Sequence, residues 1–217
     1  HKSHGGGGGD EKTPKTHTVL VFPYVAITSY KSLYGHFKPV HIKYYAYTMF
    51  DALDYAHSRG VLNNDVKPLN LLIDRRTRRM HVADWGLGEF YLPTNQTLSF
   101  HVGTRVWKAP ELLLGDTHYT YAVDVWSAAV TFAGMLYKVS HFFEGRDNHA
   151  MLLEIARVIG TQGLLDYVRK YNVPLERSWR TKHLRLYGKK SWEGLHSDAS
   201  KVNHDPLAYD VLERTLV

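Results

Sequence analysis

Apolar residues recur every three or four positions in several stretches of this chain, which is the spacing of a helix buried along one face. The longest such pattern covers 39–59, and Gly60 is the residue type that commonly ends a helix. A second segment, 121–137, is apolar on almost every side. It predicts a helix that is buried over most of its surface.

Shorter patterns predict three more helices. Amphipathic spacing favours helices at 148–159 and 162–170. A further helix is expected at 206–216, where Asp205 is a suitable N-cap and proline occupies the first helical position. The intervening segment, 174–203, is polar and irregular and predicts no regular element.

Strand patterns are few and short. Thr16–Phe22 is rich in β-branched and aromatic residues and predicts a strand that Pro23 ends. Leu71–Ile73 and Met80–Ala83 predict two strands around a basic turn, Asp74–Arg79. The expected fold class is therefore α+β, mainly helical, with short hairpins.

Composition narrows the class of protein. The 217 residues include no cysteine, which excludes disulfide scaffolds, thiolate catalysis and cysteine-ligated metals. No apolar run approaches the roughly 18 residues of a membrane span, and the expectation is an intracellular protein of the cytoplasm, the nucleus or both. The 14 histidines are scattered and favour ordinary surface and core roles over a metal site. The net charge of +6 favours an acidic partner.

The candidate chemistry is concentrated between Asn63 and Glu111. Asp65, Lys67 and Asn70 place a carboxylate, an ammonium and an amide within six residues, and Asp84 adds a second carboxylate before a glycine. A phosphoryl group in transfer requires cations beside its oxygens and a carboxylate beside the attacking hydroxyl. The spacing therefore favours magnesium-dependent phosphoryl transfer over isolated turn aspartates.

The order of these segments resembles the C-terminal lobe of eukaryotic protein kinases, and most closely the catalytic subunit of casein kinase II. Asp65–Asn70 is similar to the catalytic loop, Asp84-Trp85-Gly86 to the metal motif, and Ala109-Pro110-Glu111 to the end of the activation segment. Tryptophan in the metal motif points to the casein kinase II branch. So do segments 87–91, 124–127 and 166–172.

The resemblance implies a role for each polar residue. Asp65 would accept the proton of the substrate hydroxyl, and Lys67 would steady the γ-phosphate. Asn70 and Asp84 would hold Mg²⁺. The implied activity is transfer of the γ-phosphate of ATP, or alternatively GTP, to serine or threonine.

The resemblance also implies where adenine and substrate would bind. Phe22, Pro23 and Val25 match the hinge that holds the base through backbone groups, and Leu72 and Ala83 match the apolar floor beneath it. The alternative is that they are ordinary core residues.

Three further positions match those that attract acidic side chains after the target residue: His101, Arg105 and Lys108. Acidic protein substrates are therefore expected, as well as a regulatory subunit like that of casein kinase II. The alternative is a solvated basic loop. Direct nucleic-acid or membrane binding is not expected. The four arginines of the turn, Arg75, Arg76, Arg78 and Arg79, are interpreted as solvent-exposed, with nuclear import or polyanion binding as the alternative.

Two departures from the kinase pattern are visible. Asn63 and Asn64 stand where histidine and arginine are usual, so switching by phosphorylation of Thr94, Thr97 or Ser99 is not expected, and a brace of the catalytic loop is lost. No glycine-rich loop followed by Val-Ala-x-Lys occurs in the chain.

These observations divide the chain into a flexible glycine-rich segment (1–15), the last N-lobe strand and hinge (16–28), and a C-lobe (29–217) that is expected to be truncated at its C-terminus. Two interpretations follow. The chain is either a casein kinase II-like enzyme, of which the isolated 217 residues would transfer phosphate barely or not at all, or a pseudokinase or inactive fragment that acts only by binding proteins.

Overall fold

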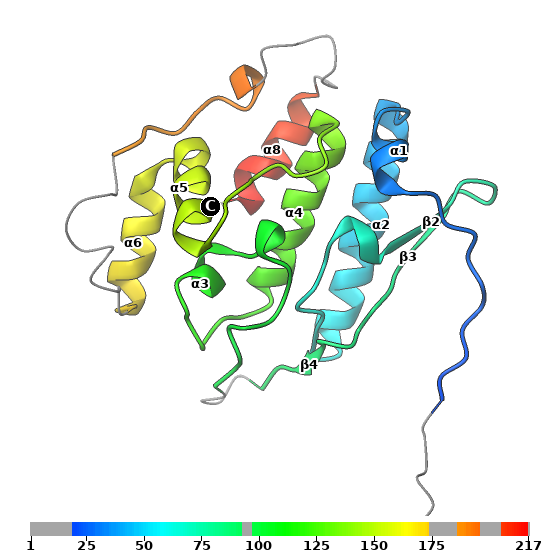
Figure 1. The fold of residues 1–217 in the computed structure, drawn as a ribbon, viewed down its shortest axis with the longest axis horizontal. Coiled ribbons are helices and arrows are strands. Elements are labelled where there is room, and N and C mark those ends of the chain that lie inside the picture. Colours follow the sequence, from blue (N-terminus) through cyan, green and yellow to red (C-terminus); the bar gives the residue numbers. More distant parts are fainter. Residues whose placement is uncertain (1–18, 93–96, 174–185, 196–204, 217) are drawn as a thin grey trace, which may run out of the picture.

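The computed structural model describes residues 19–92, 97–173, 186–195 and 205–216. Two long helices, α2 (Pro39–Ser58) and α4 (Ala122–Tyr137), pack against each other at its centre (Figure 1). The last helix, α8 (Pro206–Thr215), packs on α4. Asp205 caps α8 as predicted, because its carboxylate accepts from the Leu207 N–H at 3.1 Å.

The remaining helical elements surround this centre. Helices α5 (Asn148–Ile159) and α6 (Thr161–Tyr171) lie beyond α3 (Pro110–Leu113) in Figure 1, and α1 (Tyr30–Tyr34) precedes α2. Single 3₁₀ turns in the described part of the chain are η1 (Pro68–Asn70), η2 (Arg105–Trp107) and η3 (Glu193–Leu195). The five helices predicted from apolar spacing are all confirmed, each within about two residues of its expected ends.

Among the described residues, two small antiparallel sheets accompany the helices. Strand β2 (Leu71–Asp74) pairs with β3 (Arg79–Val82), and β1 (Val61–Leu62) pairs with β4 (Glu89–Phe90). The Asp74 carboxylate shapes the β2–β3 turn, because its Oδ1 accepts from the Arg76 N–H at 2.8 Å. This mixture of many helices and few strands agrees with the α+β expectation.

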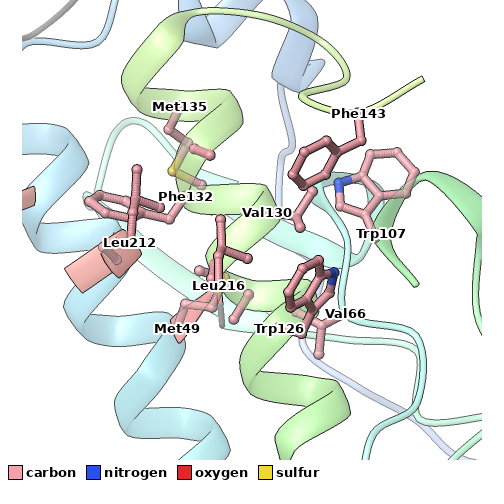
Figure 2. Packing of buried hydrophobic residues seen from close by; sticks show 14 of the residues in the cluster. Met49, Val66, Trp107, Trp126, Val130, Phe132, Met135, Phe143, Leu212 and Leu216 are labelled. Carbon is pink, nitrogen blue, oxygen red and sulfur yellow. The ribbon is translucent and has the colours of Figure 1, made fainter. Parts of the chain in front are cut away.

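The core lies between α2, α4 and α8. Figure 2 shows Met49 of α2, Phe132 and Met135 of α4, and Leu212 of α8 gathered in one cluster. Leu212 and Met49 are both 0% exposed. Burial of this kind contributes about 25 cal/mol per Å² of apolar surface removed from water, so these helices fix one another in place. None of the described helices is long and apolar enough to cross a membrane.

The strand predicted at 16–22 is wrong in its described part. Val19–Phe22 is irregular, and Val21 and Phe22 are 90% and 75% exposed. A strand requires a hydrogen-bonding neighbour, and the four described strands pair only with one another. The start of that segment, the glycine-rich stretch 1–15 and most of 174–203 lie outside the described residues.

Candidate active site

A buried carboxylate on α4 anchors the loop that follows β1. The Oδ2 and Oδ1 atoms of Asp124 accept the backbone N–H groups of Asn63 and Asn64 at 2.7 and 2.8 Å. The Nε2 atom of His57, near the end of α2, lies 2.9 Å from the same carboxylate. Asp124 is 1% exposed, so three polar groups satisfy a charge that would otherwise be costly to bury.

The two asparagines shape the loop further. The Oδ1 atom of Asn63 accepts the backbone N–H of Asp65 at 3.1 Å. Asn64 adopts a left-handed backbone (φ 64°), which asparagine tolerates, and its Nδ2 donates to the carbonyl of Leu87 at 3.1 Å. A structural brace was expected to be lost at this point, but Asn63 itself supplies a contact to Asp65.

Asp65 lies in a closed triangle of hydrogen bonds. Lys67 Nζ lies 2.5 Å from Asp65 Oδ2 and donates to Thr104 Oγ1 at 2.9 Å. The Thr104 hydroxyl in turn donates to Asp65 Oδ1 at 2.9 Å. Asp65 is 8% exposed, and each of its oxygens has a defined partner. Such contacts fix the direction in which the carboxylate can accept a proton.

Glycine at position 103 permits the approach of the Thr104 segment. Gly103 has a φ of +74°, and a Cβ atom there would lie 2.7 Å from the backbone oxygen of Asn64. A side chain would therefore push the Thr104 hydroxyl away from Asp65.

Asn70 links the loop to the β2–β3 hairpin. Its Nδ2 donates to the Asp65 backbone oxygen at 2.9 Å and to Asp65 Oδ2 at 3.3 Å. The backbone oxygen of Asn70 accepts the N–H of Ala83 at 2.8 Å. Asp84, the residue after Ala83, is therefore held across the hairpin from Asn70. Asp84 has a left-handed backbone (φ 56°), and Gly86 leaves room for it, since a Cβ at Gly86 would lie 3.2 Å from Asp84 Oδ1.

The oxygens of Asn70 and Asp84 fit a hard cation. Because the Asn70 amide nitrogen faces Asp65, its Oδ1 is the atom left to act as a ligand. Mg²⁺ prefers such oxygens and commonly takes only one or two from the protein, with phosphate and water completing the shell. Among the described residues, no three or more His, Asp or Glu side chains form a cluster that could hold a metal ion.

The residues expected to hold adenine lie in two places. Leu72 is half-buried on β2, and Ala83 directly follows β3, so both belong to the hairpin. Phe22 and Pro23 are exposed and Val25 is half-buried, in an irregular segment that shares no sheet with the hairpin. The two residues expected beneath the adenine therefore belong to the same hairpin. The expected hinge, in contrast, does not follow a described strand.

The three basic candidates gather around η2. Arg105 is exposed, and its Nη1 donates to the carbonyl of Arg146 at 2.6 Å. Lys108 is half-buried and donates to the carbonyl of Phe100 at 3.2 Å; burial, and then the neighbouring charge of Arg105, lower the pKa of its ammonium. His101 is exposed beside the Phe100 ring, with centroids 4.1 Å apart. Arg105 and Lys108 each keep further N–H donors for an acidic ligand.

Three residues of this site have no role predicted from the sequence: His57, Thr104 and Asp124. For Asp124 a signal existed, since it is the single acidic residue in the apolar segment 121–137 and a buried charge requires partners. Thr104 carries no such signal, because its role depends on Asp65, 39 residues earlier in the chain.

The family model described as the protein kinase domain matches residues 10–213. The match includes the whole of the loop, hairpin and η2 region described above.

Proposed function

Because the chain belongs to the protein kinase domain family, we propose that it is a serine/threonine kinase of the casein kinase II type that uses ATP and prefers acidic sites. The family membership makes it a phosphotransferase by descent. The observation that carries the proposal is the hydrogen-bonded triangle of Asp65, Lys67 and Thr104.

In the proposed reaction, a substrate serine or threonine hydroxyl attacks the γ-phosphorus of ATP. The bond from that phosphorus to the ADP oxygen breaks, and the hydroxyl proton passes to Asp65. Thr104 and Asn70 hold the Asp65 carboxylate in place, and Lys67 places a positive charge beside the transferring oxygens. Asn70 and Asp84 would hold Mg²⁺, which when bound neutralises charge on the phosphates.

Substrate preference is assigned to the η2 region. The guanidinium of Arg105 and the ammonium of Lys108 are close enough to influence each other electrostatically. Together with His101 they would attract carboxylates that follow the target hydroxyl. A regulatory subunit, as in casein kinase II, belongs to the same proposal.

Transfer of labelled phosphate tests the catalytic part. The 217-residue chain is incubated with γ-labelled ATP, Mg²⁺ and a peptide in which acidic residues follow one serine. Transfer by the wild-type chain is expected to be barely detectable, and Asp65→Asn should reduce it below detection. The matched control is Asp54→Asn, an exposed aspartate on α2, which should keep the wild-type rate. If wild type and Asp65→Asn give the same rate, the chain is not a kinase through this site and the protein-binding alternative replaces it.

Peptide selectivity tests the acidic preference. The double substitution Arg105→Gln/Lys108→Gln should raise KM for the acidic peptide about tenfold and leave KM for a neutral peptide unchanged. Arg169→Gln, at an exposed position on α6, is the charge control. An equal change in KM for both peptides would contradict the assignment of acidic recognition to η2.

A further inference from the structure

A polar cavity lies at the far end of the β2–β3 hairpin from the candidate active site. The catalytic loop enters β2 at Leu71, whereas this cavity borders the turn that begins at Asp74. Leu71 and Asp74 are three residue steps apart along the strand, which is about 10 Å at the usual rise. The cavity has a volume of about 140 Å³ and lies between that turn and helices α1 and α2, which are drawn close to the hairpin in Figure 1.

One wall of the cavity is apolar and preformed. It consists of Leu33, Phe37 and Tyr45, which are 3%, 7% and 5% exposed. The Phe37 ring packs against Tyr45 with centroids 5.2 Å apart and against His41 at 6.2 Å. Because these contacts hold the segment between α1 and α2 against α2, the wall does not depend on a ligand for its shape.

The opposite side carries two guanidinium groups, from Arg75 and Arg78. Neither forms an ion pair with a described residue, and no carboxylate lines the cavity. The nearest hairpin carboxylate, Asp74, is engaged by the turn itself, through the N–H of Arg76 and the N–H and hydroxyl of Thr77. The two positive charges are therefore left for an anion from outside.

Two histidines add donors to the same cavity. The Nδ1 atom of His41 accepts the backbone N–H of Lys38 at 3.1 Å. In a neutral ring this bond places the proton on Nε2, so His41 offers an N–H donor. His36 is exposed at the rim and is the fourth basic residue of the lining.

We propose that this cavity binds a phosphate monoester carried on a peptide, such as phosphoserine. A phosphate has the charge and the number of acceptor oxygens to use two guanidinium groups and an imidazole N–H together. The apolar wall can receive the side chain next to the phosphorylated residue. A nucleic acid needs a long basic track with stacking platforms, whereas these cations converge on one small enclosure. The site requires no catalysis, so it stands apart from the proposed kinase activity.

Fluorescence anisotropy tests the proposal with a labelled peptide that carries one phosphoserine between apolar residues. The 217-residue chain should bind the phosphopeptide at least tenfold more tightly than its unphosphorylated form, and added salt should weaken the binding. Arg75→Gln/Arg78→Gln should lose that preference. Arg76→Gln/Arg79→Gln removes the same charge from the same turn at residues that do not line the cavity, and should keep it. Melting curves check that both variants fold.

Two further measurements separate this site from the other basic region and from other ligands. Arg105→Gln/Lys108→Gln should retain the phosphopeptide preference, since those residues belong to η2. The proposal would be overturned if Arg75→Gln/Arg78→Gln and Arg76→Gln/Arg79→Gln lost the phosphopeptide preference equally. It would also be overturned if only Arg105→Gln/Lys108→Gln lost that preference. A third contrary result would be a single-stranded oligonucleotide that binds more tightly than the phosphopeptide and loses this binding in Arg75→Gln/Arg78→Gln. Nucleic acid would then be the ligand.

Discussion

Removal of the Asp124 carboxylate is expected to be among the most damaging single changes in this protein. Asp124→Ala leaves the backbone N–H groups of Asn63 and Asn64 buried without their acceptor, and also removes the partner of His57. A hydrogen bond to a charged group contributes about 1.5–3 kcal/mol, and an orphaned buried donor costs about 1–3 kcal/mol. Since these terms overlap, the expected loss in the free energy of unfolding is about 3–5 kcal/mol.

Urea denaturation and thermal melting measure this loss directly. A chain of this size changes its Tm by about 2–4 °C for each kcal/mol, so Asp124→Ala should melt roughly 6–20 °C below wild type. Asp54→Ala, at an exposed position on α2, is the matched control and should change stability by no more than about 0.7 kcal/mol.

A second variant separates lost hydrogen bonds from lost volume. Asp124→Asn keeps the shape of the side chain but turns an amide NH₂ toward one of the two backbone donors. It should therefore also destabilise, by about 1–3 kcal/mol. If Asp124→Ala cost less than about 1 kcal/mol, the view that this carboxylate anchors the loop would be refuted.

Three other substitutions follow from the same structure. Gly103→Ala should destabilise by about 1–3 kcal/mol in urea, because its Cβ would meet the Asn64 oxygen at 2.7 Å in a left-handed backbone; an unchanged midpoint would contradict this. Burial raises the pKa of Glu111 to about 7, so the folded state keeps a proton that the unfolded state releases near its ordinary pKa of about 4.5, and stability should fall as pH rises between those values. Glu111→Gln should flatten that part of the stability profile, and an identical slope would count against the assignment. Leu212→Ala, in the core, should cost about 2–5 kcal/mol, and a cost below about 1 kcal/mol would show that α8 contributes little to the core.

The long helices could be predicted because their signal is periodic and local. Helix α2 buries one continuous face, and its apolar residues recur at helical spacing in the sequence. Segment 121–137 contains so few polar residues that it predicts a helix buried on most sides, as α4 is. The strand predicted at 16–22 is wrong in its described part, Val19–Phe22, for the opposite reason. Thr16–Phe22 has strand composition, but a strand forms only when a second chain segment pairs with it, and that condition is not written in the segment.

The candidate site was predictable in its residue types and only partly in its geometry. The contacts of Lys67 and Asn70 with the Asp65 carboxylate follow from spacing, because the three residues lie within six positions of one another. The contribution of Thr104 does not follow, because the return of that segment is set by tertiary packing. Switching by phosphorylation of Thr94, Thr97 or Ser99 is not expected from the sequence, and this stays a prediction: Thr97 and Ser99 are exposed, and Thr94 lies outside the described residues.

The attachment of the loop to Asp124 has a consequence for the order of folding. The N–H groups of Asn63 and Asn64 find their acceptor 61 and 60 residues later in the chain. A contact that spans so many residues carries a large loop-closure entropy, whereas α2 can form from local contacts. The loop therefore acquires its final shape only when α4 docks on α2. Amide hydrogens at these two asparagines should exchange with solvent only as that docked pair opens, which makes them reporters of that opening.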